Sequence, residues 1–254
     1  VFLNYLRCHD DIGWGLDYDY LKQFGIQEVP HKKFLNDFLT GQYPGSFGRG
    51  ELYNSDPASG DARLCGTTAS LCGIEKAEWE QNEGELEQAV RFDIMLHGYM
   101  FVQSGIPVLY SGDEIGQLND YSYHEDPDKC QDSRYIHRGK FRWDLAAEIK
   151  EKGTVQNQIF DTLSQMEEIR KSHKVFDASA DVWTLDTWDN SVLGVGRWKD
   201  GEKLIALFNF SSQDKVAWIN EDDGVYTDLL TGVSMNASGV QIPAYGIWWL
   251  YKKD

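Results

Sequence analysis

The chain has 254 residues, of which 41% are hydrophobic and 13% aromatic, which is enough apolar material for one large domain or two ordinary ones. Asp and Glu number 41 against 24 Lys and Arg, and the formal charge of −17 repels phosphate backbones and anionic lipid head groups. We therefore expect neither nucleic acid nor a membrane surface as a partner. A neutral polar substrate is compatible with this charge.

The first element is an apolar run over residues 1–8, which predicts a β-strand. His9, Asp10 and Asp11 follow at the point where the strand gives way to a loop, the place where parallel barrels keep their chemistry. The His-Asp pair alone is a weak signal, because such pairs also satisfy backbone donors at strand ends. Since the chain opens on a strand, we expect it to be part of a longer protein.

A turn-rich excursion over about residues 12–83 follows the first strand. A connection of this length is uncommon in a compact domain unless it is functional or forms a subdomain. Clusters of Gly, Pro, Asn and Asp predict loops through its middle. Short helical patches are predicted over residues 18–24, 32–39 and 67–71.

The next segment alternates helix and strand. Apolar spacing predicts an amphipathic helix over residues 85–103, and the run over 105–114 predicts a short, fully buried strand. Strand, helix and strand in this order indicate a right-handed parallel unit. A polar loop over 117–142 and a helix over 155–173 follow.

From residue 182 onward the pattern changes to short alternating runs without helices, which predicts an antiparallel β domain. We therefore divide the chain into a partial barrel over residues 1–176, with the inserted subdomain at about 12–83, and a C-terminal β domain over 177–254. The expected strands cover residues 182–185, 192–198, 204–210, 216–219, 225–229 and 247–251.

The four cysteines lack paired metal-ligand spacing, and Cys65 and Cys72 stand seven apart, as on one helix face. We interpret the cysteines as reduced and mostly buried, and we favour a cytoplasmic location. An acidic stretch lacks the glycine and the terminal Glu of a calcium loop, so a solvated loop without metal is expected there. The residues concerned are Cys8, Cys65, Cys72 and Cys130, and Asp126, Asp128 and Asp132.

Taken together, these segments resemble the last quarter of the catalytic barrel of glycoside hydrolase family 13, the α-amylase family, followed by its C-terminal β domain. The signature is His9-Asp10 after one strand and Gly-x-Pro-x-x-Tyr-x-Gly-Asp-Glu over residues 105–114 on the next. Within the family the resemblance is to amylosucrases, whose insertion after strand seven matches the long excursion. It covers essentially the whole chain, with motifs over residues 6–14, 45–47, 59–63, 66–71, 112–120 and 132–138.

This resemblance implies a role for each of five residues. Asp10 matches the carboxylate that stabilises the positively charged glucosyl transition state, and His9 matches a neighbouring imidazole that binds sugar hydroxyls. Arg134 matches the guanidinium that closes the glucosyl pocket by pairing with an upstream Asp. Asp11 and Arg63 match groups that line the acceptor side.

Plainer interpretations remain for several of these positions. Asp11 and Arg63 are equally well explained as a structural ion pair. The acidic residues Asp113 and Glu114 are expected to cap the strand end and not to act as catalytic acid and base. His137 and Arg138 are expected to order the loop that presents Arg134, and Cys8, Lys32, Cys65 and Gly139 depart from the usual residues of the relatives.

The resemblance implies a transglucosidase that takes glucose from sucrose and passes it to an α-glucan or water, without a cofactor. Retaining chemistry needs a nucleophile and a proton donor about 5 Å apart. In this family both lie upstream, so we expect this chain to be inactive without the N-terminal part of the same barrel. The alternatives are a sucrose hydrolase, an α-amylase, or a non-catalytic carbohydrate-binding remnant.

Overall fold

The computed structural model describes residues 2–220 and 224–253, and the chain divides into two compact units. The first unit comprises Val1–Leu6, Val90–Val108 and Glu151–Asp254, and the second comprises Arg7–Ala89 and Leu109–Lys150. These units reflect packing within the chain. The division into a barrel over 1–176 and a β domain over 177–254 therefore stays a prediction.

The first unit contains a parallel strand pair, β1 (Leu3–Asn4) and β5 (Ile106–Pro107), with Leu3 opposite Ile106. Helix α5 (Glu83–Val102) precedes β5, which confirms the predicted strand–helix–strand order. Leu3 and Ile106 are exposed, so full burial of the second strand is wrong for this chain. The physical reason is that the two strands pair only with each other within the described residues.

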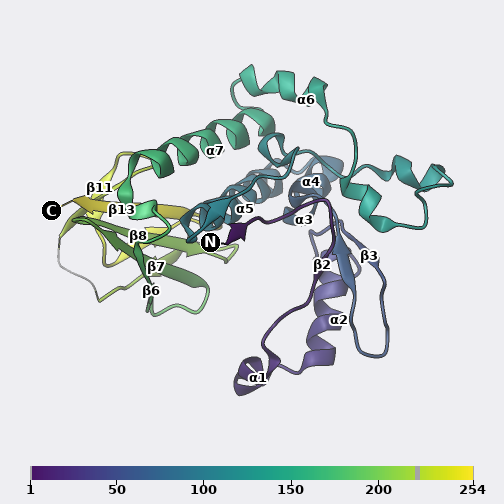
Figure 1. Ribbon diagram of the computed structural model, residues 1–254, viewed down its shortest axis with the longest axis horizontal. Coiled ribbons are helices and arrows are strands. Elements are labelled where there is room, and N and C mark those ends of the chain that lie inside the picture. The colour runs from purple at the N-terminus through teal and green to yellow at the C-terminus, as the bar shows by residue number, and fades with distance from the viewer. Residues whose placement is uncertain (1, 221–223, 254) are drawn as a thin grey trace. The chain divides into compact units, whose positions relative to one another are not determined.

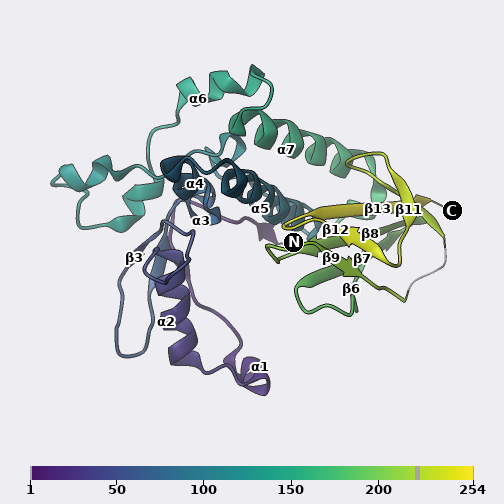
Figure 2. The ribbon, with the colours of Figure 1, turned by 180° about the vertical axis from the view of Figure 1, so that it is seen from behind.

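Helix α7 (Val155–Ser172) runs alongside α5 in the first unit (Figures 1 and 2). It begins at the Thr154 cap, whose side chain accepts a hydrogen bond from the Asn157 N–H. Arg170 donates a 2.7 Å hydrogen bond to the carbonyl of Gly105, just beyond the end of α5. The predicted stripe is buried: Ile159, Leu163, Met166 and Ile169.

The rest of the first unit is an antiparallel β-sandwich, as predicted (Figure 2). A six-stranded sheet has the order β11-β10-β13-β8-β7-β6, and β12 pairs with β9 beside it. The core between them includes Ile205, Leu207, Tyr226, Ile242 and Leu250. The strands are β6 (Asp181–Leu185), β7 (Val192–Lys199), β8 (Glu202–Asn209), β9 (Lys215–Ala217), β10 (Val225–Asp228), β11 (Ser234–Asn236), β12 (Val240–Ile242) and β13 (Ile247–Lys253).

The second unit begins with the long excursion, which is more regular than its sequence predicts (Figure 1). A three-stranded antiparallel sheet of order β2-β4-β3 was not predicted, because strands of two or three residues are too short to show alternation. The elements are β2 (Ile12–Gly13), α1 (Tyr18–Leu21), η1 (Lys22–Phe24), α2 (Glu28–Leu39), β3 (Glu51–Tyr53), β4 (Arg63–Cys65), α3 (Thr68–Cys72) and α4 (Ile74–Glu80).

Cys65 and Cys72 do not share a helix face, contrary to the expectation. Cys65 ends strand β4, and Cys72 ends helix α3. Gly66 separates the two elements with a φ of 143°, a backbone conformation that favours glycine. Both of these cysteines are buried, whereas Cys8 and Cys130 are partly exposed, and all four are free thiols.

The predicted polar loop of the second unit consists of short helical turns. Asp120 and Asp132 each cap such a turn by accepting a hydrogen bond from a backbone N–H two residues later. The turns are η2 (Asp113–Ile115), η3 (Tyr121–Glu125) and η4 (Ser133–His137), followed by α6 (Trp143–Ala147) and η5 (Glu148–Lys150).

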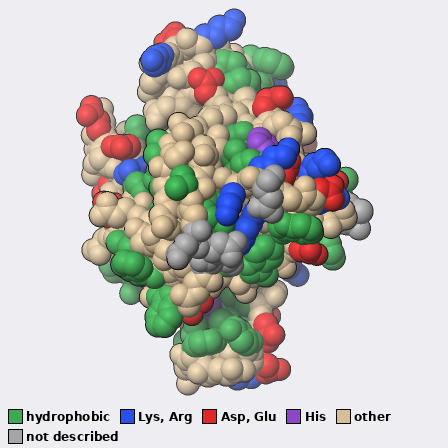
Figure 3. Space-filling model, turned by 90° about the vertical axis from the view of Figure 1, so that its left-hand side faces the viewer, with side chains coloured by type: hydrophobic (Ala, Val, Ile, Leu, Met, Phe, Trp, Pro, Cys, Tyr) green, Lys and Arg blue, Asp and Glu red, His purple; other side chains and the backbone are tan. Residues whose placement is uncertain are grey.

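On the face drawn in Figure 3, hydrophobic side chains form separate groups among charged and polar ones. Small, separate apolar patches of this kind are common on protein surfaces. Among the helices of the described residues, none has both the length and the apolar character needed to cross a bilayer.

Candidate functional site

The structure brings Asp10 and Arg134 together, although 124 positions separate them in the sequence. Arg134 lies on η4, and its Nη1 is 3.2 Å from Oδ1 of Asp10, which lies in the segment before β2. The Asp10 side chain is 51% exposed, so this ion pair leaves the carboxylate open to solvent. The resemblance had implied an upstream Asp as the partner of Arg134, and among the described residues Asp10 and Asp132 both pair with its guanidinium.

The second partner is Asp132, which holds the Arg134 guanidinium in a bidentate pair. Asp132 Oδ1 accepts from Arg134 Nε and Oδ2 accepts from Nη2, both at 2.8 Å. These bonds lower the pKa of Asp132 and raise the pKa of Arg134. The expectation of a solvated acidic loop is therefore wrong for Asp132, because a planar guanidinium two residues away matches its carboxylate geometry.

Arg138 is a further member of this cluster that sequence reasoning missed. Its Nη2 is 3.3 Å from Oδ1 of Asp10, and its Nε donates a 2.6 Å hydrogen bond to the carbonyl of His9. The sequence assigned Arg138 only an ordering role in its loop. Its position in the motif over residues 132–138, four residues after Arg134, was the available signal.

His9 lies beside Asp10 and faces solvent. Its Nε2 is 3.3 Å from Oδ2 of Asp10, and its side chain is 74% exposed. The two oxygens of Asp10 therefore have different neighbours: Oδ1 faces Arg134 and Arg138, and Oδ2 faces the His9 imidazole. We call Asp10, His9, Arg134, Arg138 and Asp132 the Asp10 cluster.

Buried groups fix the backbone beneath the Asp10 cluster. Arg7 is buried and donates from Nη2 to the carbonyl of Asp10 and to Nδ1 of His137, at 3.4 Å each. The same His137 nitrogen accepts a 3.1 Å hydrogen bond from the Gly66 N–H. Burial, together with the nearby Arg7 charge, lowers the pKa of His137 to about 4. His137 is therefore neutral near pH 7, and its contacts agree with the predicted ordering role.

An aromatic ring packs against the Arg134 guanidinium. The Arg134 guanidinium carbon lies 4.8 Å from the centre of the Tyr53 ring, within the range of a cation–π contact. Tyr53 ends β3 and pairs in register with Arg63 on β4. The three-stranded sheet that the sequence did not reveal thus positions a side chain against the cluster.

Asp11 and Arg63 lie near each other in a loose pair. The distance from Arg63 Nε to Asp11 Oδ1 is 4.0 Å, and the Arg63 side chain is 55% exposed. Arg63 crosses Gly13 so closely that a β-carbon there would lie 1.9 Å from its Nη1. A pocket of about 500 Å³ lies here, lined by Gly13, Trp14, Gly15, Asn54, Asp61, Ala62 and Arg63.

Lys32 is buried between two carboxylates. Its Nζ lies 2.7 Å from Oε1 of Glu28 and 2.5 Å from Oδ1 of Asp61. These bonds raise the pKa of Lys32. The ammonium therefore joins α2 to the loop before β4. It is not free to bind a sugar.

Asp113 and Glu114 act within their own turn. The carboxylate of Asp113 accepts a 3.3 Å hydrogen bond from the Tyr110 N–H, and that of Glu114 accepts a 2.7 Å bond from the Gly112 N–H. This agrees with the capping interpretation.

Burial raises the pKa of the Cys65 thiol to about 12, so this cysteine is an unreactive core residue. In the described part of the chain, no group of three or more His, Cys, Asp or Glu side chains could hold a metal ion.

Comparison with known proteins gives a curated relative and several solved structures of similar fold. No family model matches the chain. Glucosylglycerate phosphorylase of Escherichia coli (strain K12) is 27% identical over 166 residues, which cover 65% of this chain and 28% of that enzyme. The chain thus spans less than a third of the length of this curated relative.

Two solved structures share the fold. Sucrose 6F-phosphate phosphorylase from Thermoanaerobacter thermosaccharolyticum matches with a TM-score of 0.59 and 14% identity, over 93% of this chain and 40% of that one. The E221Q variant of AmyP in complex with maltotriose matches with a TM-score of 0.52 and 17% identity, over 66% of this chain and 35% of that one. The fold is accordingly part of a (β/α)8 barrel followed by an antiparallel β domain.

Proposed function

We propose that this chain supplies the transition-state-stabilising carboxylate of a retaining α-glucosyl-transferring enzyme. The enzyme takes glucose from sucrose and passes it to an α-glucan or to water. The observation that carries the proposal is the half-exposed carboxylate of Asp10, held by two guanidinium groups. The nucleophile and the proton donor come from another part of the protein.

The geometry of the Asp10 cluster supports this chemistry. Glycosyl transfer passes through an oxocarbenium-like transition state, and a carboxylate fixed in advance stabilises the developing positive charge without reorganisation. Arg134 and Arg138 hold Oδ1 of Asp10. Oδ2 lies beside the exposed His9 imidazole, and it can accept a further hydrogen bond from a sugar hydroxyl. Arg134 cannot swing away readily because Asp132 binds it through two hydrogen bonds.

A second candidate function is phosphorolysis, in which phosphate takes the place of the glucan or water. Two observations favour it. The chain is related in sequence to glucosylglycerate phosphorylase. The Arg63 guanidinium is largely exposed beside a pocket, and its pairing with Asp11 is loose enough to leave it available for an anion.

Product analysis separates these candidates. The full-length protein is incubated with sucrose, with and without inorganic phosphate, and fructose and glucose 1-phosphate are measured. We expect fructose release without phosphate, together with glucose or glucan. Fructose that appears only with phosphate, in equal amount to glucose 1-phosphate, would establish the second candidate. No fructose under either condition would contradict both and leave an α-glucan-cleaving enzyme or a binding remnant.

A further inference from the structure

Two separate segments form the walls of the pocket beside Arg63. One wall is formed by residues 13–15, at and just after the end of strand β2, and it includes Trp14. The other wall comes from the loop between β3 and β4, and it includes Asp61 and Ala62. Both walls lie mainly outside helices and strands, so the width of the pocket depends on the contacts that hold each of them.

Asn36 on helix α2 holds both walls through one buried amide. Its Oδ1 accepts a 2.7 Å hydrogen bond from the Trp14 indole. Its Nδ2 donates a 2.9 Å bond to the carbonyl of Gly60, the residue before Asp61. Asn36 is only 7% exposed, so a rotation of the amide would leave a buried donor or acceptor unpaired. One side chain therefore sets the distance between the two walls.

The two walls differ in how many anchors they have on α2. Gly60 packs directly on the helix, because a β-carbon at this position would lie 3.1 Å from the β-carbon of Lys32. Lys32 also pairs with Asp61, so the loop wall keeps an anchor when the Asn36 bond is lost. The indole N–H is the single hydrogen-bonding group of a tryptophan side chain. Asn36 is therefore the one polar anchor of the Trp14 wall.

The position of this pocket links its walls to the transfer step. The resemblance implies that Arg63, which lines the pocket, faces the acceptor. In that step an acceptor hydroxyl oxygen bonds to the anomeric carbon, the bond from this carbon to the enzyme carboxylate breaks, and the hydroxyl proton passes to a second carboxylate. A glucan reacts only when it is held in line, and a small displacement costs a large factor in rate. Water takes the same step without being held by the pocket walls.

We propose that Asn36 is a positioning residue that determines how the glucosyl unit is divided between glucan and water. It acts through Trp14 and Gly60, which it holds at a fixed separation. Asn36 does not belong to the Asp10 cluster, so the cleavage of sucrose proceeds without it. The choice of glucan and water as acceptors rests on the proposed function, whereas the hold of Asn36 on the two walls does not.

Asn36→Leu in the full-length protein removes both hydrogen bonds and keeps a side chain of similar size. Sucrose is the donor, maltohexaose is the acceptor, and fructose and free glucose are measured. We expect the maltohexaose concentration for half-maximal transfer to rise by about tenfold, the effect typical of one or two lost hydrogen bonds. Fructose release without glucan should change by less than about twofold, because the transition state for sucrose cleavage does not involve the pocket walls.

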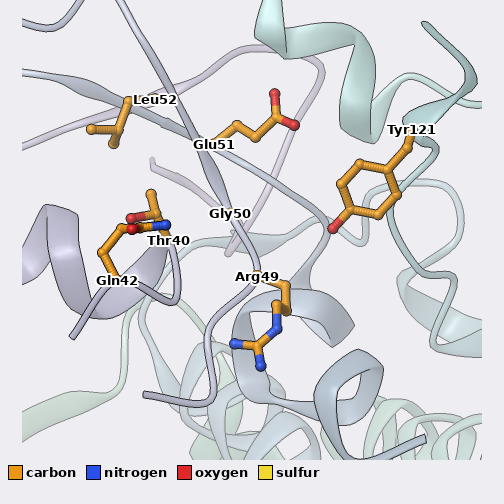
Figure 4. Close-up of a pocket in the computed structure, with 7 residues that line it drawn as sticks. All are labelled: Thr40, Gln42, Arg49, Gly50, Glu51, Leu52 and Tyr121. Atoms are coloured by element: carbon orange, nitrogen blue, oxygen red, sulfur yellow. The ribbon is translucent and has the colours of Figure 1, made fainter. Parts of the chain in front are cut away.

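Two further variants make this result specific. Trp14→Phe keeps an aromatic ring but loses the indole N–H, so we expect a smaller change of about threefold in the same direction. Added to Asn36→Leu it should have little further effect, because both substitutions break the same bond. Gln42→Leu is the matched control, because Gln42 is an exposed amide that lines a different pocket, beside Thr40 (Figure 4). It should leave the division between glucan and water unchanged.

Equal division by Asn36→Leu and Gln42→Leu would overturn the proposal, and so would a parallel fall of cleavage and transfer, which a merely structural role predicts. Fructose release by the wild type without glucan tests the proposed function alone. If it is absent, maltohexaose binding is followed through the indole N–H resonance of Trp14, identified as the signal that Trp14→Phe removes. We then expect binding by Asn36→Leu to be about tenfold weaker. Unchanged binding, or no response of this signal in the wild type, would overturn the proposal.

Discussion

At the scale of single residues, the carboxylate of Asp10 is held by ion pairs although it is half-exposed to solvent. Two arginines of the same loop reach it, and they differ in how firmly they are held. Arg134 is bound by Asp132, whereas Arg138 also binds the backbone carbonyl of His9. Arg138 thus fixes the carboxylate and the main chain that carries it.

The contribution of Arg138 can be measured by the Arg138→Ala variant of the full-length protein. We expect kcat/KM for sucrose cleavage to fall by about 10- to 100-fold, because two charge-assisted hydrogen bonds near the proposed reacting centre are lost. Arg142→Ala is the matched control, since Arg142 pairs with Asp144 at 2.5 Å in an exposed ion pair. Equal activities of the two variants would contradict the assigned role.

The buried His137 predicts a pH dependence of stability. Its pKa is lowered to about 4 in the folded protein by burial and by Arg7, against about 6.5 in an unfolded chain. The unfolded state therefore binds the proton more readily as pH falls below about 6.5, and the folded state loses stability towards pH 4. Above pH 6.5 both states carry a neutral imidazole, and the contribution is fully present.

The His137→Gln variant isolates this contribution, because an amide oxygen can still accept from the Gly66 N–H but does not titrate. Urea unfolding is measured for both proteins at pH 7 and pH 5. We expect the stability advantage of the wild type over the variant to shrink by about 2 kcal/mol between these values. An advantage that stays constant or grows towards pH 5 would show that His137 is not buried in the neutral form.

At the scale of elements, helix α2 is anchored by polar side chains on its buried face. Asn36 accepts a 2.7 Å hydrogen bond from the Trp14 indole and donates a 2.9 Å bond to the carbonyl of Gly60. Lys32, one turn earlier, binds Glu28 and Asp61. The helix is therefore attached to two segments that line the pocket beside Arg63.

Replacement of Lys32 by Met tests this anchoring. The substitution leaves Glu28 and Asp61 without their shared cation, so we expect amide hydrogen exchange in α2 to accelerate by about tenfold or more. Lys33→Met is the control, because Lys33 is the next residue on the same helix and is exposed. Exchange that is equally slow in both variants would mean that Lys32 does not hold the helix.

Elements differed in how well the sequence revealed them. Apolar periodicity predicts helices α5 and α7 and the long strands of the sandwich. Such a pattern can be recognised only over about ten residues or in a repeated alternation. Strands β2, β3 and β4 have two or three residues and leave no periodic signal. Their pairing is set by tertiary contacts, and with it the position of Tyr53.

The same limit applies to the candidate site. The motifs identified Asp10, His9 and Arg134, and the structure places them together. Asp132 looked like one of several acidic loop residues, because spacing along the chain does not show which carboxylate a neighbouring guanidinium selects. Arg138 reaches the carbonyl of His9, a contact between positions 129 residues apart that no local pattern encodes.

At the scale of the whole molecule, one buried arginine connects distant segments of the first unit. In the first unit, Arg197 is fully buried and donates to three backbone carbonyls from distant segments. They belong to Val102 at the end of α5, at 2.6 Å, and to Val175 and Asp177 before β6, at 2.7 Å each. One side chain thus joins the sandwich to the helix that precedes β5.

Arg197→Met is expected to lower the free energy of unfolding of this unit by about 3 kcal/mol, because several buried carbonyls lose their donors at once. Chemical unfolding with tryptophan fluorescence measures the change. Lys174→Met provides the comparison, since Lys174 pairs with Asp200 at the surface and its loss should cost little. Similar stabilities of the two variants would contradict the assignment of Arg197 as a structural tie.

The central claim concerns the carboxylate of Asp10, and kcat/KM for sucrose cleavage by the Asp10→Asn variant of the full-length protein tests it most directly. Asparagine keeps the shape and removes the charge, so we expect a loss on the order of a thousandfold or more with an unchanged unfolding midpoint. Asp19→Asn, at an exposed carboxylate paired with Lys22, should retain wild-type activity. A value for Asp10→Asn within a few-fold of the wild type would contradict the account.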